Sequence, residues 1–205
     1  MTGAPAASER TTPPPHARVP ASPVTAGQAR VRLPHTPDHA SCFACGPGVP
    51  SGLGLRVTDT DEQGITALVT LDDVHQGATG IAHGGIVAAV LDEATSLAVW
   101  HVLNRPNVTG RLEIQFLAPV PLGRPLRLRA TCTAVHGRKA YATAELHTDG
   151  PDGPDGPDGP GGTVAATAAA VYIAVRQDHF DHPDRHTAGT AEPRLPTPAG
   201  TAPCI

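Results

Sequence analysis

The stretch "HGGIVAAVLDEATSLAVW", residues 83–100, decides the fold of this 205-residue chain. It predicts a helix from Ile86 through Leu103, because no Gly or Pro interrupts these residues and apolar side chains recur at helical spacing. The apolar positions are Ile86, Val90, Leu91, Ala94, Leu97 and Ala98. This is the one long helix that the sequence predicts.

Strands are expected on both sides of this helix. Two segments before it, joined by a turn at 61–64, have the pattern of a hairpin. Four segments after it alternate with a period of two or are almost continuously apolar, so we expect a meander of four strands. The expected strands are 52–59, 64–73, 109–119, 125–135, 139–147 and 163–175. One long helix against an antiparallel sheet is an α+β architecture. Because the helix covers only one face of the sheet, we expect a second subunit to cover the other face or an edge strand.

The two ends of the chain differ from its middle in composition. Residues 1–38 are rich in Pro, Ala, Ser and Thr without an apolar period, which predicts a disordered leader, and 177–205 have the same character. One folded domain is therefore expected over 39–176. Within it, a threefold Pro-Asp-Gly repeat at 149–162 predicts a flexible loop.

Composition argues against two classes of partner. The formal net charge is −4 at pH 7, and no stretch clusters Lys and Arg with interleaved aromatics, so a nucleic-acid partner is not expected. The apolar runs fall short of the ~20 residues that a membrane span needs. The first residues lack the hydrophobic core of a secretory signal. We expect a soluble cytoplasmic protein with no membrane partner.

Cys42 and Cys45 form a C-x-x-C pair, a spacing found in zinc and redox sites. A structural zinc site with four cysteines would need a second pair, which the sequence lacks. A Cys2His2 cluster with His35 and His39 stays open, but the favoured interpretation is two reduced thiols in a structured turn, with no metal. Three histidines near the C-terminus could bind a metal ion weakly, but the favoured interpretation is that they belong to a solvated tail. They are His179, His182 and His186.

Asp92 lies on an apolar helix face, and a buried carboxylate is costly unless it is paired. The alternative, that Asp92 faces solvent, is equally compatible with the residues alone. Gly84 and Gly85 open the helix and leave backbone N–H donors accessible at its positive end. Such donors and a carboxylate suit acyl transfer. They are separated by roughly 10 Å along one helix, so two antiparallel helices at a dimer interface would be needed to bring them together.

"HGGIVAAVLDEA" resembles the helix motif of the hotdog-fold thioesterases, in particular the PaaI-type family. "CFACGPGVPSGLGLRV", "HQGATGIAHGG" and "VTGRLEIQFLAPVPLG" extend the resemblance over roughly residues 40–175. It implies a hotdog fold, in which an antiparallel sheet wraps one central helix, and a homodimer or homotetramer.

The resemblance also implies roles for individual residues. Asp92, nine residues after His83, takes the role of general base or nucleophile, the Gly84 N–H polarises the thioester carbonyl, and Thr109 positions water. Glu93 is one residue out of register and less well placed. Gln76 stands where some relatives have an Asn. The residues expected to contact substrate are His83, Gly85, Gln76, Glu93, Arg138 and Lys139, the last two with Arg105 as candidates for the CoA phosphates.

The implied activity is hydrolysis of an acyl thioester, with acyl-CoA as the expected substrate, to a free acid and a thiol. No cofactor is expected, since CoA belongs to the substrate. A module that binds acyl-CoA or an acyl carrier without catalysis is the alternative from another class, and a hotdog dehydratase is a third. The acyl group is not predicted.

Overall fold

The computed structural model describes residues 10–19, 40–148, 163–176 and 179. The chain divides into two units, Met1–Val175 and Arg176–Ile205, and all elements belong to the first. The expected flexible loop at 149–162 lies outside the described residues, as does the expected tail apart from His179.

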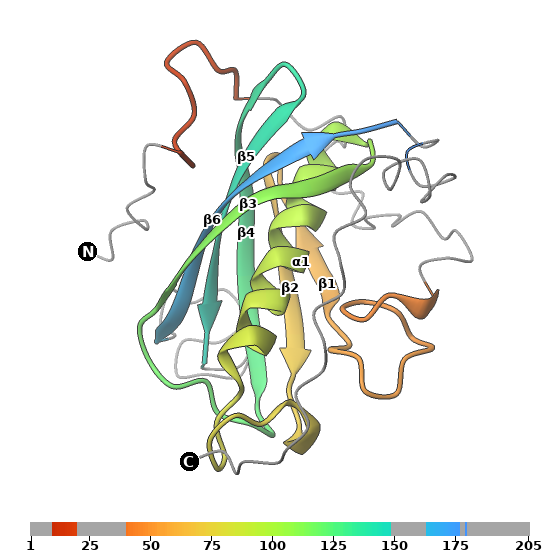
Figure 1. Ribbon diagram of the computed structural model, residues 1–205, viewed down its shortest axis with the longest axis vertical. Coiled ribbons are helices and arrows are strands. Elements are labelled where there is room, and N and C mark those ends of the chain that lie inside the picture. Colours follow the sequence, from red (N-terminus) through yellow and green to blue (C-terminus); the bar gives the residue numbers. More distant parts are fainter. Residues whose placement is uncertain (1–9, 20–39, 149–162, 177–178, 180–205) are drawn as a thin grey trace, which may run out of the picture. The chain divides into compact units, whose positions relative to one another are not determined.

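One long helix, α1 (Gly84–Leu103), lies against a six-stranded antiparallel sheet (Figure 1). This confirms the α+β architecture. The strands are β1 (Arg56–Thr60), β2 (Gly64–Thr70), β3 (Asn107–Phe116), β4 (Pro125–His136), β5 (Lys139–His147) and β6 (Val164–Ala174), and a short 3-10 helix, η2 (Asp73–His75), follows β2. Their order across the sheet is β1-β2-β4-β5-β6-β3.

The hairpin β1–β2 and the meander β4–β5–β6 are confirmed, but the expectation of a four-strand meander is wrong. β3 does not pair with β4, and it lies instead at the far edge of the sheet, hydrogen-bonded to β6. The reason is that alternation along one strand shows which side chains are buried but carries no information about the neighbouring strand. β1 also begins later than expected, because the N–H groups of Leu53 and Leu55 donate to the carbonyls of Phe43 and Ala44.

α1 is buried along the face that the sequence predicted, with Val90, Leu91, Ala94 and Ala98 fully inaccessible. The helix begins at Gly84, two residues earlier than expected, and Asn104 caps its end in a left-handed conformation. Small side chains on β5 and β6 allow the helix to lie close to the sheet. These are Ala142, Ala144, Ala168 and Ala170, all buried.

By length and composition α1 could cross a membrane, which the sequence argument from apolar runs overlooked. More than half of its most apolar window is buried inside the protein. The same apolar composition is therefore accounted for by its place in the core of the domain.

The expectation of a disordered leader through residue 38 is wrong for residues 10–19. Arg18 forms an antiparallel bridge with Val135 of β4, with both backbone hydrogen bonds present. Thr11 is buried, and its hydroxyl donates to Glu113 Oε2 at 3.1 Å. Sheet edges and faces offer such partners to polar segments, so low apolar content alone did not exclude an ordered contact.

Candidate active site

Asp92 lies at the ninth position of α1, half-buried, between the helix and strands β3 and β6. Two hydroxyl groups donate to its Oδ1 atom: Thr109 Oγ1 at 2.9 Å and the Tyr172 phenol at 2.8 Å. Among the described residues, the Oδ2 atom accepts no hydrogen bond. The carboxylate is thus held by one oxygen, while the other can act on a reactant. The structure thus brings together two of the predicted site residues, Asp92 and Thr109.

Tyr172 is a site residue that sequence reasoning missed. It is fully buried in β6, and its hydroxyl lies 2.7 Å from Thr95 Oγ1 and 2.7 Å from the Asp92 carbonyl oxygen. Burial, together with the negative charge of Asp92, raises the pKa of Tyr172 far above its usual value. The phenol therefore stays protonated and available as a donor. The available signal was the tyrosine in a strand that otherwise holds only aliphatic residues and Thr167, since a buried phenol needs a hydrogen-bond partner.

A β-bulge positions Thr109. The register of β3 against β6 shifts between Thr109 and Arg111, which leaves Gly110 as an extra residue and sets Thr109 opposite Tyr172. Under strict alternation Thr109 would share the outward face with Arg111. The bulge turns it to the helix side, the face that Leu112 also shares.

His83 is the N-cap of α1, with φ −64° and ψ 138°. Its Nδ1 atom accepts the N–H of Gly85 at 3.0 Å, so that donor is already used inside the chain. The N–H of Gly84 has no hydrogen-bond partner among the described residues, and Gly84 is exposed. The cap therefore leaves one donor at the helix start free for a ligand, about 12 Å along the helix axis from Asp92.

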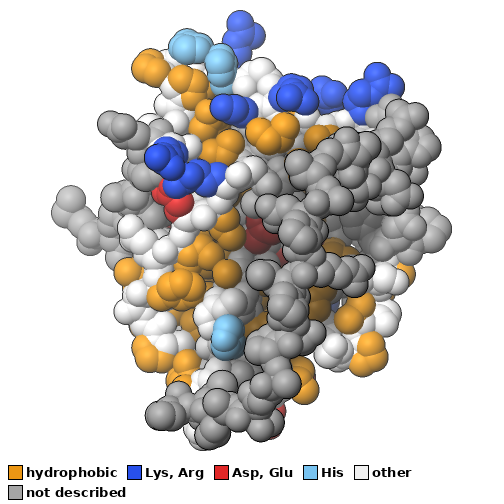
Figure 2. Space-filling view, viewed as in Figure 1, with side chains coloured by type: hydrophobic (Ala, Val, Ile, Leu, Met, Phe, Trp, Pro, Cys, Tyr) orange, Lys and Arg blue, Asp and Glu red, His pale blue; other side chains and the backbone are white. Residues whose placement is uncertain are grey.

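The other residues expected to contact substrate do not gather around Asp92. Gln76 Oε1 accepts the N–H of Gly80 within the loop before the helix. Arg138 and Lys139 lie at the β4–β5 turn, at the opposite end of the sheet from the start of α1 (Figure 1). Arg105, exposed, follows the end of α1. Figure 2 shows that Lys and Arg side chains gather at this same end.

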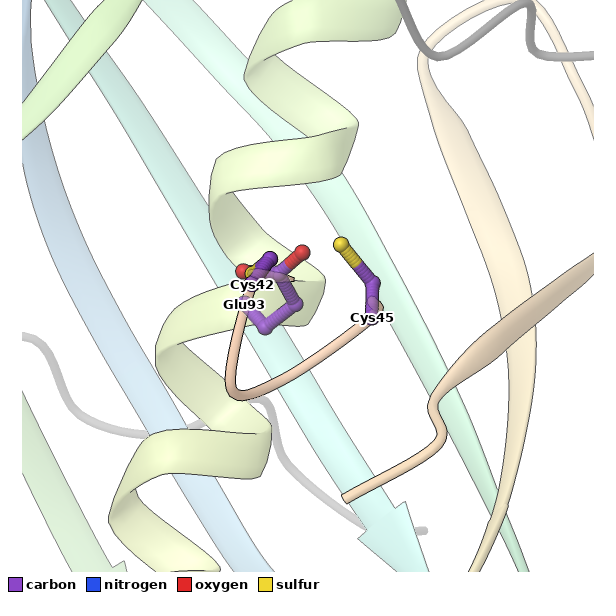
Figure 3. A group of neighbouring side chains, drawn as sticks. All are labelled: Cys42, Cys45 and Glu93. Atoms are coloured by element: carbon purple, nitrogen blue, oxygen red, sulfur yellow. The ribbon is translucent and has the colours of Figure 1, made fainter. Parts of the chain in front are cut away.

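Glu93, the neighbouring acid, lies against the two cysteines of the C-x-x-C turn (Figure 3). Burial, followed by the charge of Glu93, raises the pKa of Cys45 far above its usual value. A thiol held in its protonated form is a poor nucleophile in the absence of a metal ion.

β3 is an edge strand of the sheet formed by the described residues, and its Thr109 contacts Asp92. β3 is antiparallel to α1: Ser96 Oγ donates to Asn107 Oδ1 at 3.1 Å near its start, and at its end a Cβ atom on Gly84 would lie 3.8 Å from the Phe116 ring. Phe116 and Leu117 are each 58% exposed. Exposed apolar side chains at the end of an edge strand are typical of a subunit interface.

Both the sequence and the structure of this chain are similar to those of thioesterases. Residues 79–154 match the model of the thioesterase superfamily. The chain is similar to a solved phenylacetic acid degradation-related protein from Ralstonia eutropha JMP134, with 26% identity and a TM-score of 0.52 over 62% of this chain and 90% of that one. No curated protein matches the sequence.

Two further solved structures share the fold. A thioesterase superfamily protein is 23% identical with a TM-score of 0.54 over 64% of this chain, and the match spans 62% of that protein's length. A hypothetical thioesterase from Streptococcus pneumoniae TIGR4, solved with coenzyme A, is 15% identical with a TM-score of 0.50, over 60% of this chain and 90% of that one.

Proposed function

We propose that this chain, whose described domain belongs by its hotdog fold and its sequence match to the thioesterase superfamily, hydrolyses acyl-CoA to a free acid and CoA. The observation that carries the proposal is the carboxylate of Asp92, fixed through Oδ1 by Thr109 and Tyr172, while no described residue donates a hydrogen bond to Oδ2. A buried or half-buried carboxylate is costly, and an oriented one with a free oxygen suits general-base or nucleophilic chemistry.

In the general-base route, Asp92 Oδ2 takes a proton from water as the water oxygen bonds to the thioester carbon. The carbonyl oxygen becomes an oxyanion, which the Gly84 N–H at a helix start stabilises. The carbon–sulfur bond then breaks, and the CoA thiolate leaves and takes up the proton from Asp92. In the nucleophilic route, Oδ2 itself bonds to the carbon, the carbon–sulfur bond breaks as the CoA thiolate leaves and takes up a proton from solvent, and water then hydrolyses the resulting anhydride to the free acid and the Asp92 carboxylate. No metal or other cofactor enters either route.

The two halves of this site meet only if two subunits combine. In the proposed dimer, β3 of one subunit pairs antiparallel with β3 of the other, and Thr109 lies opposite the partner subunit's Phe116. Because Thr109 contacts Asp92 and Phe116 lies beside Gly84 of its own chain, this pairing would bring Asp92 next to the partner subunit's Gly84. The exposed Phe116 and Leu117 support such an interface, and closing the edge removes unpaired backbone groups. We therefore propose a homodimer as the smallest active unit, which a tetramer would also contain.

CoA as the thiol is supported by the coenzyme A complex of the Streptococcus pneumoniae relative. The basic end of the domain, with Arg138, Lys139 and Arg105, offers charges for the nucleotide phosphates. The proposal places the protein in the cytoplasm, where CoA thioesters and reduced cysteines such as Cys42 and Cys45 occur. The second candidate, an acyl-CoA binding module, would keep the fold without turnover.

A thiol-release assay over a panel of acyl-CoA chain lengths tests the proposal. Asp92→Asn should lower kcat about 1000-fold on the best substrate, because it removes the base or nucleophile. Asp59→Asn, an exposed acid on the opposite edge strand β1, is the matched control and should keep full activity. Binding without turnover would support the module instead. Full activity of Asp92→Asn together with an inactive Glu93→Gln would place the reaction on the other acid.

A single turnover in oxygen-18 water tests for an anhydride that is hydrolysed at the Asp92 carbon, although hydrolysis at the acyl carbon gives the same labelling as direct attack by water. An anhydride hydrolysed at the Asp92 carbon would leave the label in the protein, whereas direct attack by water would place it only in the released acid.

A further inference from the structure

Two cysteines and a glutamate from distant parts of the chain lie together outside the proposed active site. Cys42 and Cys45 come from the loop before β1, and Glu93 comes from the middle of α1 (Figure 3). One ligand atom of each, the two Sγ atoms and a carboxylate oxygen, lie within 4.8 Å of one another, and all three residues are half-buried. Three potential metal ligands thus converge on one point.

The loop is built to hold both thiols toward the helix. The N–H of Gly46 donates to the Cys42 carbonyl at 2.8 Å, closing the Cys-x-x-Cys-Gly turn. A Cβ atom at Gly46 would lie 2.5 Å from that carbonyl oxygen and 2.6 Å from the Ala40 carbonyl oxygen, so the turn requires glycine. The N–H of Leu53, donating to the Phe43 carbonyl at 2.8 Å, fixes the loop between the two cysteines.

The ligand set matches the chemistry of zinc. Two thiolates are soft ligands, which favour the borderline-soft Zn²⁺ ion over Mg²⁺ or Ca²⁺, and zinc also accepts a carboxylate oxygen. In a tetrahedral site with Zn–S bonds of about 2.3 Å and a Zn–O bond of about 2.0 Å, two sulfur atoms lie about 3.8 Å apart and a sulfur and an oxygen about 3.5 Å apart, so the ligand atoms need to approach one another by no more than about 1.3 Å. Rotation of the Glu93 side chain and of the two cysteine χ1 angles covers such a distance.

We propose that Cys42, Cys45 and Glu93 bind one Zn²⁺ ion, with a water molecule as the fourth ligand. Zinc forms two bonds to sulfur and one to the carboxylate oxygen, and the two thiol protons pass to solvent. The ion joins the loop before β1 to α1 one residue after Asp92, so it fixes the part of the helix that carries the reactive carboxylate. The inference does not rest on the proposed thioesterase activity, since it concerns ligands that the mechanism leaves unused.

Metal content and cobalt spectroscopy on the full-length protein test this site. The protein, purified under reducing conditions without chelator, should contain about one zinc per chain. After removal of zinc, Co²⁺ should give the thiolate-to-cobalt charge-transfer band in the near ultraviolet and the intense visible bands of a tetrahedral site.

Cys42→Ser and Cys45→Ser should each weaken binding of Co²⁺ and Zn²⁺ by at least 100-fold, and Glu93→Gln by at least 10-fold. Cys132→Ala is the matched control, because this cysteine is buried in β4 and should leave binding unchanged.

Three results would overturn the proposal. They are a protein that binds neither Zn²⁺ nor Co²⁺ at micromolar concentration, a Cys42–Cys45 disulfide as the resting state by intact mass, and zinc that survives Glu93→Gln but is lost when His35 and His39 are replaced by Asn. The last result would assign the site to the histidines in place of Glu93. Because these readouts do not use catalysis, they stand whether or not the thioesterase assay succeeds.

Discussion

Thr109 Oγ1 donates a hydrogen bond to Asp92 Oδ1 at 2.9 Å, which joins the edge strand β3 to the middle of α1. Thr109 is opposite Tyr172 in the β3–β6 ladder, and both hydroxyls meet the same carboxylate oxygen. The two strands and the helix are therefore connected at one atom of Asp92. Each hydroxyl can be removed separately, which makes its contribution measurable.

Thr109→Val should lower kcat about tenfold, while Thr109→Ser should keep most of the activity. Valine has the shape of threonine without the hydroxyl, whereas serine keeps the donor to Asp92, and tenfold corresponds to about 1.4 kcal/mol, the scale of one hydrogen bond. Steady-state thiol release with both variants measures the difference. If the valine variant retained the wild-type kcat, Thr109 would have no positioning role.

Tyr172→Phe should lower kcat about tenfold with little change in KM or in thermal stability. The variant loses the second donor to Asp92 Oδ1, but Thr95 keeps the Leu91 carbonyl as an acceptor at 2.8 Å, so no buried donor is left unpaired. The kcat and KM values, with a melting curve beside them, distinguish the two roles. A large loss of melting temperature at unchanged kcat would mean that Tyr172 only stabilises the core.

The sequence predicted the helix that carries Asp92, but it did not predict the strand arrangement that surrounds this residue. The helix and the burial of its apolar face were predicted from the spacing of Val90, Leu91 and Ala94, because helical periodicity is a local property. The partner of β3 and the bulge at Gly110 were not predictable from alternation, since both depend on contacts with a strand more than fifty residues later. For the same reason Tyr172 was missed.

The alkaline stability of the protein should depend on Cys132. Burial raises the pKa of this thiol to about 11 from an ordinary value of 9.0, so the folded state favours the protonated form. That contribution is complete below pH 9, where the unfolded thiol is also protonated, and is lost as the pH rises from 9 through 11. Its upper limit is about 3 kcal/mol.

Urea unfolding of wild type and Cys132→Ala at pH 7 through 10.5, with a reducing agent, measures this contribution. The free energy of unfolding of the wild type should fall more steeply above pH 9 than that of the variant, although alanine lowers the value at pH 7 by leaving a small cavity. Parallel curves for the two proteins would show that Cys132 ionises as readily in the folded chain as in the unfolded one.

Gly84→Pro should lower kcat about 100-fold without unfolding the helix. A loss of this size is typical when one hydrogen-bond donor to the oxyanion is removed. Proline lacks the N–H, yet it is accepted at the first helical position, and the extended backbone of His83 suits a residue before proline. Gly84→Ala is the control that keeps the N–H, since its Cβ would meet only the Phe116 ring at ordinary contact distance. Equal activity of the two variants would remove Gly84 from the mechanism.

Mixing the two inactive chains tests whether the site is shared between subunits. A heterodimer of Gly84→Pro and Asp92→Asn contains one site with both substitutions and one site with neither, if Asp92 of one subunit works with Gly84 of the other. Random pairing of equal amounts gives half heterodimers, so co-expression should restore about a quarter of the wild-type activity per chain. If both groups of a site came from the same subunit, every site in the mixture would carry a substitution, and activity would stay at the level of the separate variants.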